Sequence, residues 1–213
     1  MRVRTLTVGL FQSNCYLVSC ERTNEAIVID AGGEGERILD AIEKEKLDIK
    51  AIVNTHAHID HVSALSVVAS AKPVPVLMHE GDMPIFNNLS TQAAMFGVSA
   101  PEDIEITRFI RSGDTIEFGD ITGGVIHTPG HSPGSISLIF RGENPQVIFT
   151  GDTLFMGSIG RTDLYGGDFE TIIKSLREVF LPLPGRTVVY PGHGDHTTIG
   201  TEKQFNPFMS QLV

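Results

Sequence analysis

The sequence predicts an α/β fold in which mixed sheets are covered by helices. Short buried apolar runs typical of strands alternate with stretches whose apolar residues recur at helical spacing. No proline- or serine-rich linker and no block of like charge divides the chain, and it shows no period typical of solenoid repeats. Because 213 residues are enough to bury one large core, we expect a single domain over residues 1–213.

The first half of the chain begins with strand-like patterns and then alternates helix and strand. Residues 3–10 alternate apolar and polar side chains, and "AIVID" at 26–30 is a buried-type run closed by two glycines. In the first helical stretch, Ile38, Ala41, Ile42 and Leu47 fall near helical spacing. The predicted strands are 3–10, 16–18, 26–30, 51–53 and 76–78, and the predicted helices are 34–47 and 61–70.

The second half is richer in strands. Residues 80–100 fit no single pattern, and we expect one helix and a mobile loop there. The clearest helix runs from Asp168, a suitable N-cap, to Phe180, with an apolar stripe that begins at Phe169. The last twenty or so residues are expected to be mostly loop with a short helix. The predicted strands are 104–110, 114–118, 125–127, 135–140, 147–150 and 187–190.

Composition and charge exclude several classes of function. The chain has 16 Lys and Arg residues against 26 Asp and Glu residues, a net charge of -10, so we expect no nucleic-acid partner. No run approaches the roughly 18 apolar residues of a membrane span. The N-terminal "MRVRTLTVGLF" lacks a signal-peptide core and cleavage site. We therefore expect a cytoplasmic protein with a small-molecule partner and no membrane partner.

The chain has two cysteines, Cys15 and Cys20. Their odd separation in a strand-like run places them on opposite faces, so we expect two reduced, buried thiols and no disulfide. Neither lies near a ligand motif, so cysteine is not expected to bind a metal.

Ligand-type side chains crowd into "NTHAHIDH" at residues 54–61. His56, His58, Asp60 and His61 lie so close in sequence that neither a strand nor a helix turns all four to one side. A loop at the end of a strand can do so. The short strand 51–53 leads directly into this stretch.

Three further buried runs also end in a histidine or an aspartate, usually through a turn that contains glycine. If the four strands share one sheet direction, their ligands meet at one sheet edge. Imidazoles and carboxylates suit zinc, and also iron or manganese, and so many ligands suit two adjacent ions better than one. The candidate ligands are His56, His58, Asp60, His61, His131, Asp152 and His193.

The remaining histidines have plainer expectations. His79 follows a strand and has no ligand partner nearby in sequence. His127 lies within an apolar run, so a packing role is expected. His196, in a glycine-rich loop, is expected on the surface, with substrate contact as the alternative.

At these motifs the chain resembles the metallo-β-lactamase superfamily. "THAHIDH" (55–61), "HTPGHSPGS" (127–135), "GDTLF" (151–155) and "YPGHG" (190–194) are similar to its metal motifs. The resemblance implies a four-layer αββα sandwich with the site at one edge. It also implies that one ion is held by His56, His58 and His131, a second by Asp60, His61 and His193, and that Asp152 bridges the two ions.

Within the superfamily, "GDTLFMGSIGRTDL" and the terminal "NPFM" are most similar to the glyoxalase II, or hydroxyacylglutathione hydrolase, group. Those enzymes carry a helical C-terminal domain after the last metal histidine. Here residues 194–213 follow His193, so the resemblance is to a short form without that domain. It implies hydrolysis of a thioester such as S-lactoylglutathione by a hydroxide that bridges two ions, with Asp60 and Asp152 as the catalytic carboxylates.

Arg161, in "GRTD", is the candidate for binding a substrate carboxylate, and Tyr165 is a weaker candidate. The alternative for Arg161 is an internal salt bridge with Asp163 or Asp168.

Two other functions stay open. The chain also resembles iron-dependent persulfide dioxygenases through "GRTDL", in which case His56, His131 and Asp152 would hold one iron. A metal-stabilised binding protein without catalysis is the second alternative. β-Lactamase activity is less expected because the chain shows no export signal, and nuclease activity because the surface is acidic.

Overall fold

A computed structural model of the chain describes residues 1–98, 101 and 104–212, which fall into two compact units. The first comprises Met1–Ile110 and Glu117–Ile121, and the second comprises Arg111–Ile116 and Thr122–Val213. Each unit is built on a six-stranded sheet that carries helices, as the α/β prediction requires. A single domain over residues 1–213 stays a prediction.

The first sheet has the strand order β1-β2-β3-β4-β5-β6. The strands from β1 to β3 pair antiparallel, and those from β3 to β6 pair parallel. Parallel neighbours end at the same edge of a sheet, so the segments that follow β3, β4 and β5 begin close together. The strands are β1 (Arg2–Val8), β2 (Ser13–Ser19), β3 (Glu25–Ile29), β4 (Asp48–Val53), β5 (Val76–Met78) and β6 (Arg108–Phe109).

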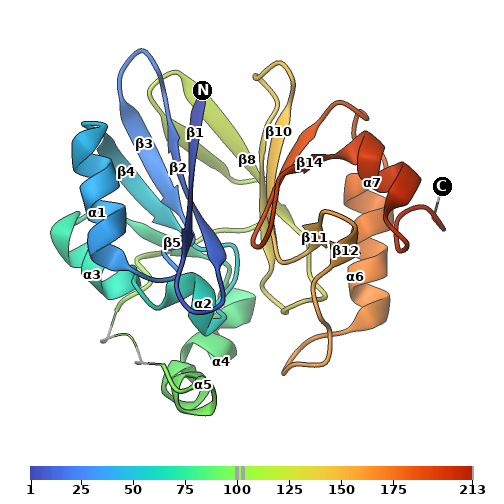
Figure 1. Ribbon diagram of the computed structural model, residues 1–213, viewed down its shortest axis with the longest axis horizontal. Helices are drawn as coiled ribbons and strands as arrows, with labels where there is room; N and C mark the ends of the chain where they lie inside the picture. The colour runs from blue at the N-terminus through green and yellow to red at the C-terminus, as the bar shows by residue number, and fades with distance from the viewer. Residues whose placement is uncertain (99–100, 102–103, 213) are drawn as a thin grey trace. The chain divides into compact units, whose positions relative to one another are not determined.

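Helices α1 and α3 lie side by side over one face of this sheet (Figure 1). Ile38 and Ile42 of α1 and Leu65 and Val68 of α3 are buried in a common core with the strands, which explains their helical spacing in the sequence. The helical segments of this unit are α1 (Gly35–Lys44), α2 (Ile59–Val62), α3 (Leu65–Ala71), the 3-10 turn η1 (Glu80–Asp82), α4 (Met83–Phe86) and α5 (Leu89–Phe96).

The second sheet has the strand order β14-β13-β10-β9-β8-β7, and β11 and β12 form a separate hairpin. β8 and β10 both pair antiparallel with β9, and β13 pairs parallel with β10, so β8, β10 and β13 run in one direction. The strands are β7 (Thr115–Phe118), β8 (Ile121–His127), β9 (Ile136–Phe140), β10 (Val147–Gly151), β11 (Leu154–Phe155), β12 (Ser158–Ile159), β13 (Val188–Pro191) and β14 (Thr197–Thr198).

Two helical segments pack on the second sheet. α6 (Phe169–Ser175) continues as one π-helical turn (Leu176–Phe180), and α7 (Ile199–Phe205) follows β14. Ile172 of α6 is buried in the core of this unit. The Asp168 carboxylate accepts the Thr171 N–H at 2.7 Å, which confirms the predicted N-cap.

Most predicted elements are present, but two of the elements and the placement of one side chain were predicted wrongly. The expected helix 61–70 is interrupted between α2 and α3, because the Ala64 N–H bonds to the Ala31 carbonyl at 2.9 Å and the Ser63 hydroxyl bonds to Gly32. The expected strand 104–110 is reduced to β6, whose Phe109 side chain is 48% exposed. Phe169, expected on the apolar stripe of α6, is also exposed.

Residues 80–100 hold more structure than one helix and a loop. The turn η1 and the helices α4 and α5 fill positions 80–96, and residues 99–100 lie outside the described part of the chain. Cys15 and Cys20 are both buried and form no disulfide, as predicted.

Within the described ranges, no helix combines the length and apolarity needed to cross a bilayer. The cytoplasmic location stays a prediction.

Candidate metal centre

The candidate ligands come from two sheets, and the expectation of a single sheet edge was wrong. β4 belongs to the first sheet and leads into the loop that carries His56 and His58. β8, β10 and β13 belong to the second sheet and lead to His131, Asp152 and His193. The first sheet ends at the short edge strand β6, so the strand-rich stretch that follows builds a sheet of its own. The shared direction of β8, β10 and β13 does bring their ligands to one edge of that second sheet.

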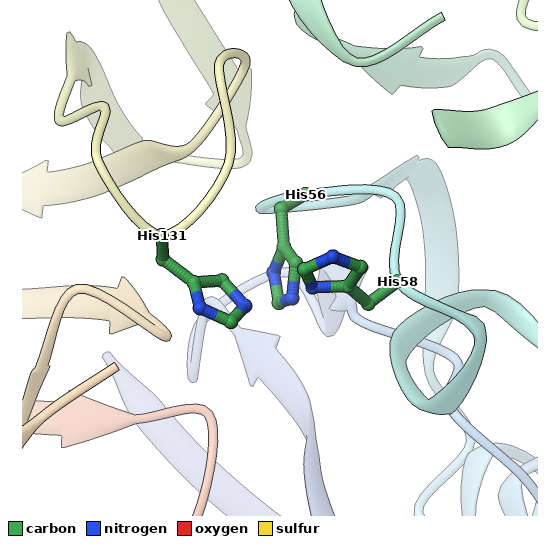
Figure 2. Close-up of side chains that lie close together, drawn as sticks. All are labelled: His56, His58 and His131. Carbon is green, nitrogen blue, oxygen red and sulfur yellow. The ribbon is translucent and has the colours of Figure 1, made fainter. Parts of the chain in front are cut away.

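In the first unit, a loop and one helical turn divide the ligands between them. His56 and His58 extend from the loop after β4 (Figure 2), and Asp60 and His61 lie in the first turn of α2. His58 has extended backbone angles (φ -68°, ψ 148°), so the chain changes direction there. The His56 ring centroid lies 5.0 Å from that of His58 and 4.1 Å from that of His61. The irregular backbone gathers side chains that a regular element would separate.

Asp30, which follows β3, lies beneath this loop and was not predicted as a site residue. Its side chain is buried and accepts three hydrogen bonds. One carboxylate oxygen accepts the Thr55 N–H at 2.7 Å. The other accepts the Thr55 hydroxyl at 2.7 Å and bonds to Nδ1 of His61 at 3.1 Å. One carboxylate therefore holds both the start of the loop and the first turn of α2.

This network determines which ring nitrogen carries the proton in two histidines. A carboxylate oxygen accepts hydrogen bonds, so Nδ1 of His61 is the protonated nitrogen. The Thr55 hydroxyl uses its proton on Asp30, so at 3.1 Å it accepts the proton on Nδ1 of His56. In both rings Nε2 therefore carries the lone pair. A metal ion binds the ring nitrogen that carries the lone pair.

The loop also packs closely against the turn that carries Gly32. A Cβ atom at Gly32 would lie 1.9 Å from the Asp60 carbonyl oxygen, so only glycine fits there. The same carbonyl accepts the Ser13 hydroxyl at 2.6 Å. These contacts hold the backbone of Asp60 while its carboxylate stays partly exposed, with 19% of the side chain accessible.

In the second unit, Asp152 lies between two histidines. Its Oδ2 is 3.5 Å from Nε2 of His131 and 3.6 Å from Nε2 of His193. Nδ1 of His131, the ring drawn in Figure 2, donates to the Arg161 carbonyl at 2.8 Å, so Nε2 again carries the lone pair. The second unit therefore presents one carboxylate with an imidazole on either side.

The spacing of these donor atoms fits a shared ion. Two ligands that each lie about 2.0–2.1 Å from one tetrahedral zinc are roughly 3.3 Å apart. The nitrogen-to-oxygen separations around Asp152 are 3.5 and 3.6 Å, and Nε2 of His61 lies 3.6 Å from Oδ2 of Asp60. These distances are longer than good hydrogen bonds and close to ligand spacing. Within the first unit, donor atoms of Asp30, His56 and His61 also lie within 4.8 Å of one another.

The hairpin β11–β12 supports the second set of ligands. A Cβ atom at Gly160 would lie 1.8 Å from the Asp152 carbonyl oxygen, so the chain after β12 passes directly against that residue. The Phe155 ring meets the His193 ring edge to face, with centroids 6.0 Å apart. The hairpin therefore contacts His193, and the residue that follows it contacts Asp152.

Glu202 of α7 and Asn206, which follows this helix, form a buried polar cluster that holds the hairpin in place. Glu202 is 1% exposed. Its carboxylate accepts hydrogen bonds from the Gly157 N–H at 2.8 Å and from the Thr197 hydroxyl at 2.6 Å. The Asn206 amide donates to Glu202 at 2.9 Å and to the Ser158 carbonyl at 3.0 Å. The asparagine of "NPFM" thus links α7 to the hairpin.

Arg161 forms the internal ion pair that was its alternative role. Two of its nitrogens donate to the Asp163 carboxylate at 2.7 Å each, and both side chains are more than half exposed. The guanidinium lowers the pKa of Asp163 to about 2. Tyr165 is 74% exposed. Substrate binding by Arg161 and Tyr165 stays a prediction.

The other histidines behave largely as expected. Nε2 of His127 donates to the Pro133 carbonyl at 2.8 Å, which confirms a packing role. His196 is on the surface and stacks on Tyr190. His79 has a more specific role, because its Nδ1 accepts the Gly81 N–H at 3.1 Å and caps the turn η1.

The supporting residues were missed because each acts through tertiary hydrogen bonds. Asp30 did carry a signal, since it ends an apolar strand just as the predicted ligands do. Asp82 and Gln92, which bond to the ligand loop, lie in a stretch without a readable pattern. Nothing local in the sequence distinguishes them from surface residues.

Comparisons with known proteins agree with this architecture. The crystal structure of the B3 metallo-β-lactamase BLEG-1 is similar at a TM-score of 0.91 and 36% identity, covering 98% of this chain and 100% of that one. The crystal structure of TTHA1623 in a di-iron-bound form has a TM-score of 0.88 and 36% identity, with 96% and 99% covered. Hydroxyacylglutathione hydrolase GloC of Haemophilus influenzae is 39% identical over 212 residues, with 99% of each chain covered.

The fold class predicted from the sequence, the metallo-β-lactamase α/β sandwich, is confirmed by these structures. The family model for the metallo-β-lactamase superfamily matches residues 8–193, which is most of the chain. The chain therefore belongs to the metallo-β-lactamase superfamily, whose members are metallo-hydrolases that bind divalent ions.

Proposed function

We propose that this protein is a metal-dependent hydrolase that cleaves a thioester such as S-lactoylglutathione. The observation that carries the proposal is the arrangement of ligand-type atoms within each unit. His56, His61 and His131 each have Nδ1 engaged in a hydrogen bond, which makes Nε2 the ring nitrogen that carries the lone pair. The relative named a hydroxyacylglutathione hydrolase supports the substrate class.

In this proposal His56, His58 and His131 would hold one divalent ion, Asp60, His61 and His193 would hold a second, and Asp152 would contribute a carboxylate to both. Imidazole and carboxylate donors suit zinc first, and iron or manganese next. The di-iron form of TTHA1623 supports iron as a second candidate.

Two bound ions would supply an activated water near neutral pH and polarise the thioester carbonyl. The protein's own residues would orient the reactants. The Asp60 side chain is partly exposed, so one of its oxygens can accept a hydrogen bond from the attacking water. The departing thiol has a pKa near 8.5 and leaves readily as a thiolate, so no protein acid is required. Arg161 would bind a substrate carboxylate by exchanging Asp163 for it.

The test is a metal analysis followed by a substrate panel. Purified protein is expected to contain about two ions per chain and to hydrolyse at least one thioester with a kcat/KM of about 10⁴ M⁻¹s⁻¹ or more. Asp152→Ala should lose at least about 10³-fold in that value. Asp120→Ala, a surface change in the first unit, is the matched control and should retain activity. One iron per chain with oxygen uptake on a glutathione persulfide would instead identify a persulfide dioxygenase.

A second candidate reaction is hydrolysis of a β-lactam ring. The similarity to BLEG-1, a B3 metallo-β-lactamase, favours it. A cephalosporin belongs in the same panel, and a kcat/KM above that of every thioester would replace the thioesterase assignment. Bound metal without turnover of any thioester, lactone, persulfide or cephalosporin would instead favour a metal-stabilised binding protein.

A further inference from the structure

Two side chains from residues 80–96 bond to the backbone on either side of His58. Oδ2 of Asp82 accepts the Ala57 N–H at 2.9 Å. Oε1 of Gln92 accepts the Ile59 N–H at 3.1 Å. The network around Asp30 reaches His56 and His61 through hydrogen bonds to their rings or through Thr55. The support of His58 therefore comes from a different part of the chain.

Asp82 is held in place from several directions. It is fully buried and ends the 3-10 turn η1, in which its N–H donates to the His79 carbonyl at 3.2 Å. The residue that it contacts, Ala57, is also fully buried and packs in a small apolar cluster with Met78 and Ile85. A buried carboxylate is rarely tolerated without a specific partner. Its bond to Ala57 thus fixes the peptide group that precedes Ala57 in the ligand loop.

Gln92 is oriented at both ends of its side-chain amide. Its Nε2 donates to the Ile85 carbonyl at 3.0 Å while its Oε1 accepts from Ile59. Rotating the amide by half a turn would place two donors together and two acceptors together, so only one orientation is stable. Gln92 thus fixes the peptide group that follows His58.

The backbone between these two anchors has little freedom. The His56–Ala57 and His58–Ile59 peptide groups are both hydrogen-bonded, and only two residues lie between them, which restrains the extended conformation of His58 and the direction of its Cβ. A metal ligand must be placed within a few tenths of an ångström, and such placement depends on surrounding hydrogen bonds. We propose that Asp82 and Gln92 are positioning residues that hold His58 for metal binding. This inference rests on the proposed metal centre.

Stepwise metal titration of the metal-free protein, in competition with a chelator, tests the proposal. Asp82→Ala and Gln92→Ala should each weaken the binding of one ion about 10–100-fold and leave the other within about threefold. Asp82→Asn should bind like the wild type, because the amide oxygen can still accept the Ala57 N–H. Asp114→Ala is the matched control, since that carboxylate accepts a backbone N–H at 2.9 Å in an exposed turn. It should leave both affinities unchanged.

A second readout is independent of catalysis. Nitrogen-15 spectra of the His58 ring in the zinc-loaded protein should show the ring bound in the wild type and Asp82→Asn, and exchanging in Asp82→Ala and Gln92→Ala. Thermal melting of each variant establishes that it is folded. Gln92 is only half-buried, so we expect Gln92→Ala to fold. That variant still tests the proposal if Asp82→Ala does not fold.

The outcomes separate the inference from the function on which it rests. Folded Asp82→Ala and Gln92→Ala proteins that bind both ions like the wild type would overturn the inference and leave the hydrolase proposal standing. Equal losses in Asp82→Asn and Asp82→Ala would also overturn it, because charge rather than the hydrogen bond would then be responsible. Wild-type protein that binds no divalent ion would overturn the metal centre and the inference together.

Discussion

Replacing Asp30 by asparagine should weaken metal binding without changing the shape of the side chain. Asp30 has a positive φ of 55°, a conformation that asparagine adopts as readily as aspartate, so the backbone can stay in place. The new amide group must replace one carboxylate oxygen. If the amide group faces Thr55 Oγ1 and Nδ1 of His61, it donates a hydrogen bond to each. Nδ1 of His61 must then accept, and the Thr55 hydroxyl must donate to Nδ1 of His56. Both rings would therefore carry their protons on Nε2. If the amide group faces the Thr55 N–H, two donors oppose each other.

The size of the effect follows from the bonds that change. Hydrogen bonds to a charged group contribute about 1.5–3 kcal/mol each, and neutral ones about 1 kcal/mol. Asp30 accepts three, so the substitution should lower the free energy of unfolding by about 2–4 kcal/mol. Loss of a hydrogen bond behind a ligand typically weakens metal binding 10–100-fold, equal to about 1.4–2.8 kcal/mol at 1.4 kcal/mol per tenfold.

Three measurements check this prediction: zinc affinity by chelator competition, metal content, and the melting temperature of the metal-free protein. The control is Asp114→Asn. The Asp114 carboxylate also accepts a backbone N–H, but it lies in an exposed turn. The variant should bind zinc about 10–100-fold more weakly, whereas the control should bind like the wild type. Unchanged zinc affinity in a folded Asp30→Asn protein would refute the inference that metal binding needs both carboxylate oxygens of Asp30.

Three other outcomes are expected. Gly160→Ala should lower the melting temperature and the free energy of unfolding by about 1–3 kcal/mol, because its Cβ would lie 1.8 Å from the Asp152 carbonyl oxygen; an unchanged melt would contradict this close approach. Nuclear magnetic resonance titration of Asp163 should give a pKa of about 2, below its usual 3.8, because Arg161 stabilises the charged form. The pair's contribution to stability is then complete above pH 3.8 and lost as the pH falls through about 2; a midpoint at 3.8 would show that the pair does not form in solution. Removing the metal with a chelator should abolish hydrolysis reversibly. It should also lower the free energy of unfolding, which calorimetry can measure. The loss should be about 2.7 kcal/mol for each ion that was present at a free concentration of 100 times its dissociation constant.

Local patterns in the sequence predicted most of the fold. The buried runs and the helical stripes depend on the period of the side chains, and that period is visible in the sequence. Asp168 illustrates a second local signal, since its capping bond reaches only three residues along the chain. Histidine and aspartate residues at the ends of four buried strands likewise located the candidate ligands without any knowledge of the strand order.

The errors arise where distant segments compete with local preference. The helix expected at 61–70 is broken because Ala64 bonds to Ala31 across the unit. The assignment of β4 to a different sheet from β8 depends on where a sheet ends, which no local pattern records. Asp82 and Gln92 lie 25 and 33 residues from the loop positions that they hold. Contacts over such separations need the folded structure.

The bonds from Glu202 and Asn206 make α7 and the β11–β12 hairpin a single cooperative unit. The hairpin cannot separate from its surroundings without breaking the same buried bonds that anchor α7. Both segments therefore share one free energy of local opening, although more than 40 positions separate Gly157 from Glu202. A sequence change in the C-terminal helix is consequently also a change in how often His193 loses the support of Phe155.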